Sequence, residues 1–176
     1  MAHPDAMSEQ DRVTDLIRAR HDWFRAHFSA VENARGDIGT LTSLWAELAA
    51  RLEVHAAAEE ALFYPRLLKD DADAVEDTED AIRDHNDIRD GIRDAQQHPV
   101  GDEPWWKAVH ATDHANTEHM EEEEEGPLRE FDEFASAGEQ AEVAASFEAF
   151  EIEHAGARGI SIEDKDPERY IEENAP

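Results

Sequence analysis

Residues 40–69 read TLTSLWAELAARLEVHAAAEEALFYPRLLK, and this stretch decides the fold. Its apolar side chains recur at steps of three and four residues, the spacing that places them on one face of an α-helix. The stripe also carries a histidine and a glutamate, and its members are Leu41, Trp45, Leu48, Leu52, His55, Glu59 and Leu62. The stretch therefore predicts a long amphipathic helix that turns His55 and Glu59 toward the protein interior.

Three further stretches show the same helical spacing. They run from about Ser8 to Arg35, from Ala74 to Gln97, and from Pro104 until Gly126 and Pro127 end the last one. No stretch of the sequence shows the alternation of apolar and polar residues that is typical of β-strands. Four long helices with short connections predict an all-α fold, an antiparallel up-down-up-down four-helix bundle.

Turn-forming residues mark the connections between these helices. They are Gly36 and Gly39, the DADA stretch around Asp71, and HPVGDEP at residues 98–104. We assign residues 8–135 to the bundle and residues 136–176 to a C-terminal helix and a polar tail. The helix is expected at Gln140 to His154, and the polar tail after it is expected to be disordered.

Polar residues on the four apolar stripes form an internal repeat. Each half of the chain has a lone histidine on its first helix and a His-x-x-x-Glu motif on its second. The repeated pairs, each separated by 64 residues, are His21 and His85, His55 and His119, and Glu59 and Glu123. Residues four apart share a helix face, so each motif directs one imidazole and one carboxylate inward. Burying these groups without partners costs several kcal/mol apiece, on the order of 1–3 or more.

Metal ions would compensate this cost, and the composition limits which metal fits. The chain contains no cysteine, so a transition metal must use His, Asp or Glu ligands. Structural zinc sites usually close with four ligands, and calcium and magnesium prefer oxygen ligands throughout. Four imidazoles and two carboxylates therefore predict a centre of two iron or manganese ions, with iron favoured, in which the glutamates bridge the ions.

The fourth helix offers a second histidine–glutamate pair, His114 and Glu118. The helix face of this pair is largely charged, and it includes Glu103, Lys107, His110, Glu121 and Glu125. Such a face is typical of solvent-exposed surface. We therefore favour His119 and Glu123 as the inward pair and keep His114 and Glu118 as the alternative.

Each helix carries a recognisable motif: RHDWFRAHF from Arg20, HAAAEEALFYP from His55, DHNDIRDGI from Asp84 and HMEEEEEGP from His119. Together these four motifs resemble those of hemerythrin-like (HHE cation-binding) domains, over about residues 8–135. The resemblance implies an oxo- or hydroxo-bridged diiron centre. It also implies terminal histidine ligands and bridging glutamates, and the residues concerned are His21, His55, His85, His119, Glu59 and Glu123.

The resemblance also indicates which branch of that family the chain is similar to. Oxygen-carrying hemerythrins add a second histidine one turn along the third helix, where this chain has Arg89. They also have an aspartate where this chain has Glu123 or Glu124. The site is therefore similar to the more symmetrical centres of sensing and redox relatives, and reversible oxygen transport is not the expected function.

These observations predict a non-haem diiron protein that binds or senses dioxygen, nitric oxide or peroxide, or handles iron. A ferritin-like ferroxidase is a rival, but it requires Glu-x-x-His motifs on two helices, and EIEH at residues 151–154 is the one copy. A metal-free or structurally zinc-bound helical interaction module is the second rival. We expect a metal- or ligand-binding protein rather than an enzyme.

The charge and hydropathy of the sequence indicate which partners and which cellular location to expect. The formal net charge is −29, which repels nucleic-acid phosphates and anionic membranes, so neither is an expected partner. The acidic, lysine-poor composition indicates adaptation to high salt, where this charge is screened. The sequence shows no signal-peptide pattern and no apolar run of membrane-spanning length, so we expect a cytoplasmic protein.

Overall fold

The computed structural model describes residues 12–70 and 74–176, and helices dominate them. These residues contain no β-strand, so the predicted all-helical bundle is confirmed. The elements are α1 (Val13–Asn33), α2 (Ile38–Ala58), the π-helical turn η2 (Glu59–Phe63), α3 (Tyr64–Asp70), α4 (Val75–Ala95), α5 (Glu103–Glu125), α6 (Pro127–Phe134), α7 (Ala137–Glu153) and α8 (Pro167–Asn174).

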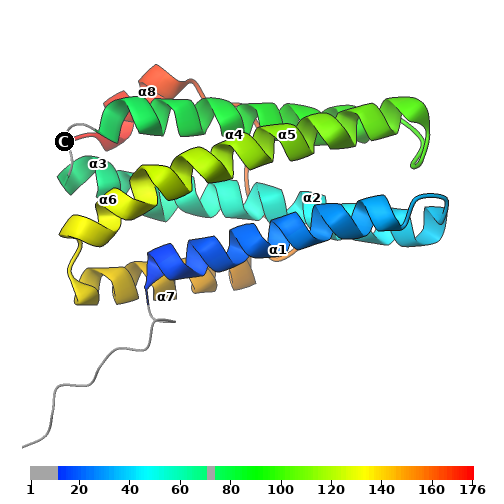
Figure 1. Ribbon diagram of the computed structural model, residues 1–176. Helices are drawn as coiled ribbons and strands as arrows, with labels where there is room; N and C mark the ends of the chain where they lie inside the picture. The colour runs from blue at the N-terminus through cyan, green and yellow to red at the C-terminus, as the bar shows by residue number, and fades with distance from the viewer. Residues whose placement is uncertain (1–11, 71–73) are drawn as a thin grey trace, which may run out of the picture.

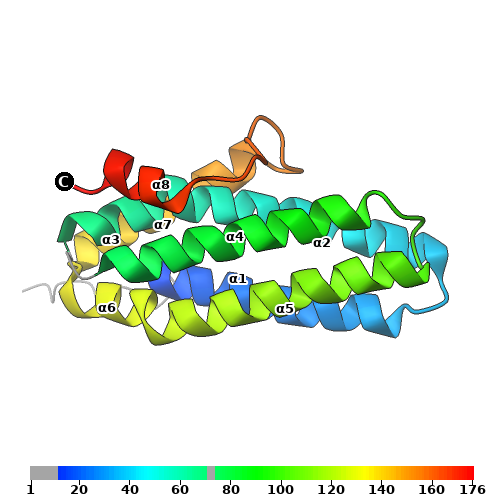
Figure 2. The same cartoon turned by 90° about the horizontal axis from the view of Figure 1, so that it is seen from above.

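The long helices α1, α2, α4 and α5 lie side by side (Figure 1). Helix α1 packs against α2, and α4 packs against α5. Helix α7 covers α1 and α2, whereas α8 lies along α4, as Figure 2 shows from above. The antiparallel up-down-up-down order of the long helices stays a prediction. Within the described ranges no helix has the length and apolar character needed to cross a membrane.

Local sequence explains where the helices begin and end. The Asp37 side chain accepts a hydrogen bond from the Thr40 backbone N–H and caps the start of α2. Helix α2 therefore takes in Gly39, which the sequence had indicated as a turn residue. Helix α5 has a proline in its first turn and ends before Gly126, as predicted. The turn predicted around Asp71 and the first residues of the predicted Ser8–Arg35 helix lie outside the described residues.

The core consists of two apolar clusters with a layer of polar residues between them. Along α1, Ile17 belongs to one cluster, Phe24 to the other, and His21 lies between them. The same order recurs along α4, on either side of His85. The helices therefore hold the buried polar side chains at one level of the bundle, with apolar packing above and below.

Two further features differ from the sequence prediction. The predicted helix at residues 40–69 contains the π-helical turn Glu59–Phe63, and such turns often lie at functional sites. The polar tail, expected to be disordered, contains α8. Tyr170 of α8 is buried, and its hydroxyl donates a hydrogen bond to the Glu60 carbonyl oxygen at 2.5 Å. This aromatic anchor is the physical reason that the tail folds back onto the bundle.

Candidate metal centre

The six residues predicted as metal ligands meet in the polar layer of the bundle. They come from α1, α2, η2, α4 and α5, and each is at most 5% exposed. They are His21, His55, Glu59, His85, His119 and Glu123. Their convergence agrees with the internal repeat, in which each half supplies one lone histidine and one His-x-x-x-Glu pair.

Two groups of three side chains have ligand geometry. In the first group, His55 Nε2 lies 2.8 Å and His21 Nε2 lies 4.0 Å from Glu59 Oε1. In the second group, His85 Nε2 lies 3.1 Å and His119 Nε2 lies 3.6 Å from Glu59 Oε2. Within each group the ligand atoms all lie within 4.8 Å of one another. Each group is therefore small enough to surround one cation.

Glu59 belongs to both groups, and its two carboxylate oxygens face different histidine pairs. Glu59 therefore offers one oxygen to each of the two candidate cation positions. Glu123 also lies between the groups, because its Oε2 is 3.3 Å from His21 Nε2 and 3.9 Å from His119 Nε2. Its other oxygen, Oε1, accepts a hydrogen bond from the Tyr64 hydroxyl at 2.8 Å.

Several buried polar atoms of this layer have no hydrogen-bond partner among the described residues. They are His21 Nε2, both ring nitrogens of His55, Glu59 Oε1 and Glu123 Oε2. His55 Nε2 is close to Glu59 Oε1, but the two are not aligned for a hydrogen bond. Because unpartnered buried polar groups are costly, imidazole nitrogens and carboxylate oxygens aimed at common points fit cations well.

The electrostatics of the layer couple Glu59 to the histidines. Burial alone raises the pKa of Glu59, but His55, His119 and His85 outweigh burial and hold that pKa well below its usual value. For His119, burial lowers the pKa, but Asp84, Glu59 and Glu123 raise it well above the usual value. Protons and cations would therefore compete for the same positions.

A carboxylate and an arginine support His85 from behind. His85 Nδ1 lies 2.9 Å from Glu60 Oε1, and Arg89 donates to both Glu60 oxygens at 2.8 and 2.9 Å. Lys165 adds an ion pair to Glu60 at 2.6 Å. Burial raises the pKa of Glu60, but the hydrogen bond with His85 and the charges of His85, Arg89 and Lys165 lower it to about 2. Glu60 is thus a fixed anion behind the histidine.

His21 has the corresponding support. Its Nδ1 lies 2.8 Å from Glu124 Oε1, and Arg25 donates to the same oxygen at 2.9 Å. A carboxylate behind a ligating histidine fixes the ring orientation and makes the ring a stronger ligand. Glu60 and Glu124, which the sequence analysis does not assign to the centre, thus both lie against histidines. Their positions, each directly after a candidate bridging glutamate, were the signal.

Sequence reasoning missed Tyr64, Asp84 and Lys165 at the centre. Tyr64 is fully buried and comes directly after the π-helical turn in the sequence. Helical periodicity does not predict this turn, so it does not predict that Tyr64 lies beside Glu123. The alternative ligand pair behaves differently, since the side chains of His114 and Glu118 are 74% and 60% exposed. These two residues lie on the surface, away from the buried layer.

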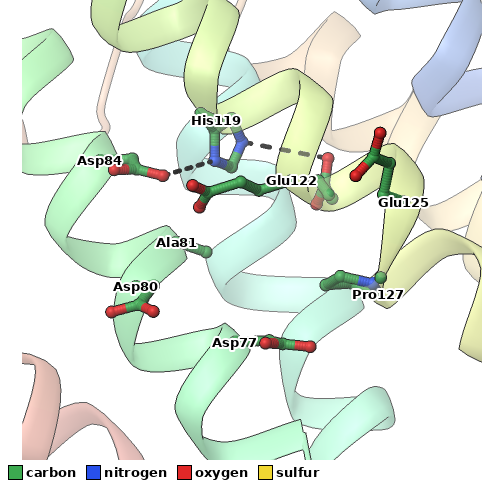
Figure 3. A pocket seen from close by; sticks show the side chains of 10 residues that line it. Asp77, Asp80, Ala81, Asp84, His119, Glu122, Glu125 and Pro127 are labelled. Atoms are coloured by element: carbon green, nitrogen blue, oxygen red, sulfur yellow. Dashed lines mark ion pairs between the residues drawn. The ribbon is translucent and has the colours of Figure 1, made fainter.

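A pocket of about 360 Å³ leads from the surface to the centre between α4 and α5 (Figure 3). Its lining includes the buried His119 and Glu123. Asp84 faces the His119 ring (Figure 3). The outer residues are largely acidic and include Asp77, Asp80, Glu122 and Glu125. The pocket therefore connects solvent with two candidate ligands through a negatively charged entrance.

Comparison with known proteins agrees with this geometry. The model of the hemerythrin HHE cation binding domain matches residues 12–131, which is more than half of the chain and includes all six candidate ligands. Neither the curated proteins nor the solved structures gave a match. The matched residues are those that build the buried layer of imidazoles and carboxylates. The chain therefore belongs to the hemerythrin HHE cation binding domain family.

Proposed function

We propose that this protein holds two iron ions and uses them to bind or sense dioxygen, nitric oxide or peroxide. His21 and His55 would hold one ion, His85 and His119 would hold the other, and Glu59 would bridge them. Glu123 is the proposed second bridge. The observation that carries the proposal is the division of the two Glu59 oxygens between the two histidine pairs.

Iron supplies the redox chemistry, since ferrous iron with an open coordination position binds such small ligands by donating electron density to them. The chain supplies the surroundings. Apolar clusters on both sides of the polar layer limit access of water, and Tyr64 holds one oxygen of Glu123. The pKa of Tyr64 is raised well above its usual value by burial and by the charges of Glu123 and Glu59, so its hydroxyl remains a donor.

The acidic entrance of the pocket favours the entry of cations. Burial and the nearby charges of Asp84 and Asp80 raise the pKa of Glu122, because the carboxylates repel one another. A cation at the entrance relieves this repulsion, so the pocket attracts cations toward His119 and Glu123. The negative charge of this pocket therefore favours iron handling as a second function.

The two rival functions have less support. The EIEH motif of the ferroxidase rival lies at the end of α7, where Glu151 pairs with Arg20 and the half-buried His154 contacts the Arg158 carbonyl oxygen. A metal-free interaction module would leave the buried polar atoms of the centre without compensation. We also propose the antiparallel order of the long helices, which the short connections after α1 and α4 support. The cytoplasmic location and the exclusion of nucleic-acid and membrane partners stay predictions.

Ligand binding is tested by loading metal-free protein with ferrous iron under anaerobic conditions and in concentrated salt, followed by nitric oxide. We expect a new visible absorption that saturates with nitric oxide. His21→Ala and His85→Ala should each reduce the signal, whereas the exposed His114→Ala should leave it unchanged. Iron-loaded protein whose spectrum does not respond to nitric oxide, dioxygen or peroxide would refute the ligand-binding function.

A further inference from the structure

The two halves of the centre share a nearly symmetrical support. Behind His21 lie Glu124 and Arg25, and behind His85 lie Glu60 and Arg89, with closely similar distances. The supporting residues follow the same internal repeat as the candidate ligands, because Arg89 and Glu124 lie 64 residues after Arg25 and Glu60. The repeat therefore extends beyond the ligands to the groups that orient them.

The residue that precedes each lone histidine breaks the symmetry. In the second half this residue is Asp84, whose Oδ2 lies 3.7 Å from His119 Nδ1 (Figure 3). In the first half it is Arg20, which turns away and donates to both oxygens of Glu151 at 2.9 and 2.8 Å. The His55 ring thus receives no counterpart of Asp84.

Aromatic rings enclose His55 instead. The centroids of Phe24 and Phe147 lie 5.1 and 5.6 Å from the His55 ring, both edge-on. Its Nδ1 is buried and has no hydrogen-bond partner in residues 12–70 and 74–176. Imidazoles that ligate metals nearly always donate their other N–H to an acceptor. His55 is therefore a weaker ligand than His119.

The C-terminal segment strengthens the second half further. Lys165, beyond the matched residues 12–131, pairs with Glu60, whose side chain is 0% exposed. The Asn86 side chain holds the Lys165 backbone through hydrogen bonds of 2.7 and 2.9 Å. Glu124 has Arg25 alone as cation partner among the described residues, and its side chain is 28% exposed. Glu60 is therefore held more rigidly than Glu124.

We propose that the two metal positions differ in affinity and fill in order, the position of His85 and His119 first. This inference rests on the proposed two-ion centre. Both histidines of the second half face a carboxylate, whereas in the first half His21 alone does so. Loss of such a supporting carboxylate typically lowers metal affinity roughly 10- to 100-fold, so one missing support is enough to separate two binding steps.

The experiment is an anaerobic titration of metal-free, full-length protein with Co²⁺, followed by visible absorption and by the hyperfine-shifted imidazole N–H signals in the NMR spectrum. We expect two resolved binding steps. Glu60→Gln should weaken the first step by about 10-fold or more, and the matched variant Glu124→Gln should weaken the second step and leave the first unchanged. The reverse pattern, or a single step with equal constants, would overturn the proposal.

A second variant guards against misfolding. Glu60→Gln leaves the buried Arg89 without its anion, so this variant could fail to fold. Asp84 is only partly buried, with 25% of its side chain exposed, and Asp84→Asn keeps its shape. Asp84→Asn should also weaken the first step and spare the second. Two equal steps refute the ordered filling alone, whereas binding of no Co²⁺ refutes the two-ion centre and the inference together.

Discussion

Replacement of Tyr64 by phenylalanine removes one atom beside the proposed centre. The Tyr64 hydroxyl is buried and donates a hydrogen bond of 2.8 Å to Glu123 Oε1. The other oxygen of Glu123 has no hydrogen-bond partner among the described residues. Among the described residues, the Tyr64 hydroxyl is the one hydrogen-bond donor to the buried Glu123 side chain, and Tyr64→Phe removes it.

The size of the effect follows from the charge of the acceptor. Hydrogen bonds to charged groups contribute about 1.5–3 kcal/mol, and bonds between neutral groups about 0.5–1.5 kcal/mol. We therefore expect Tyr64→Phe to lower the free energy of unfolding of the metal-free protein by about 1.5–3 kcal/mol. For a chain of this length each kcal/mol shifts the melting temperature by about 2–4 °C, so a loss of roughly 3–12 °C is expected.

Tyr170→Phe is the matched control, because it removes a buried hydroxyl that donates to the neutral Glu60 carbonyl. Its expected cost is about 0.5–1.5 kcal/mol. The assay is denaturant unfolding of both variants, with chelator and at constant salt, followed by circular dichroism. If Tyr64→Phe proves no more destabilising than Tyr170→Phe, the hydroxyl does not hold a buried anion and the reasoning fails.

Three further predictions concern packing and pH. A Cβ at Gly91 would lie 2.3 Å from Thr112 Oγ1 of the facing helix, so Gly91→Ala should cost about 1–3 kcal/mol in denaturant unfolding. Phe147 of α7 is fully buried, so Phe147→Ala should cost about 3–5 kcal/mol; a neutral result would show that α7 is not part of the core. In metal-free protein, the depressed pKa of Glu59 gives stability that is present above its usual value of 4.5 and lost as pH falls through the folded value. The raised pKa of His119 gives stability that is present below its usual value of 6.5 and lost as pH rises through the folded value. The free energy of unfolding, measured against pH, should therefore be highest between pH 4.5 and 6.5.

The sequence was sufficient for the helices and for the candidate ligands because both depend on local spacing. Apolar residues three and four apart define a buried helix face, and histidines or glutamates on that face must point inward. The charged helix face of His114 and Glu118 favours His119 and Glu123 as the inward pair, and the structure shows His114 and Glu118 exposed. Family membership is shown, and the ligand role of these residues is our proposal.

The remaining features depend on contacts between distant segments. Lys165 reaches Glu60 because α8 packs on α4, and nothing in the polar tail itself indicates this. Tyr64, the first residue of α3, reaches Glu123 directly after a π-helical turn, whose wider geometry differs from the 3.6-residue period used to assign faces. The pairing of Glu60 with His85 and of Glu124 with His21 crosses between the halves of the repeat, so it follows from the packing of the helices.

The iron content of the protein tests the central claim most directly. Metal-free protein would be loaded with ferrous iron under anaerobic conditions, separated from free metal in concentrated salt, and measured by elemental analysis. We predict about two irons per chain in the unaltered protein and a clear loss of iron in Glu59→Gln, because this residue faces both histidine pairs. Absence of iron, or a single zinc ion that Glu59→Gln does not affect, would contradict the two-iron centre.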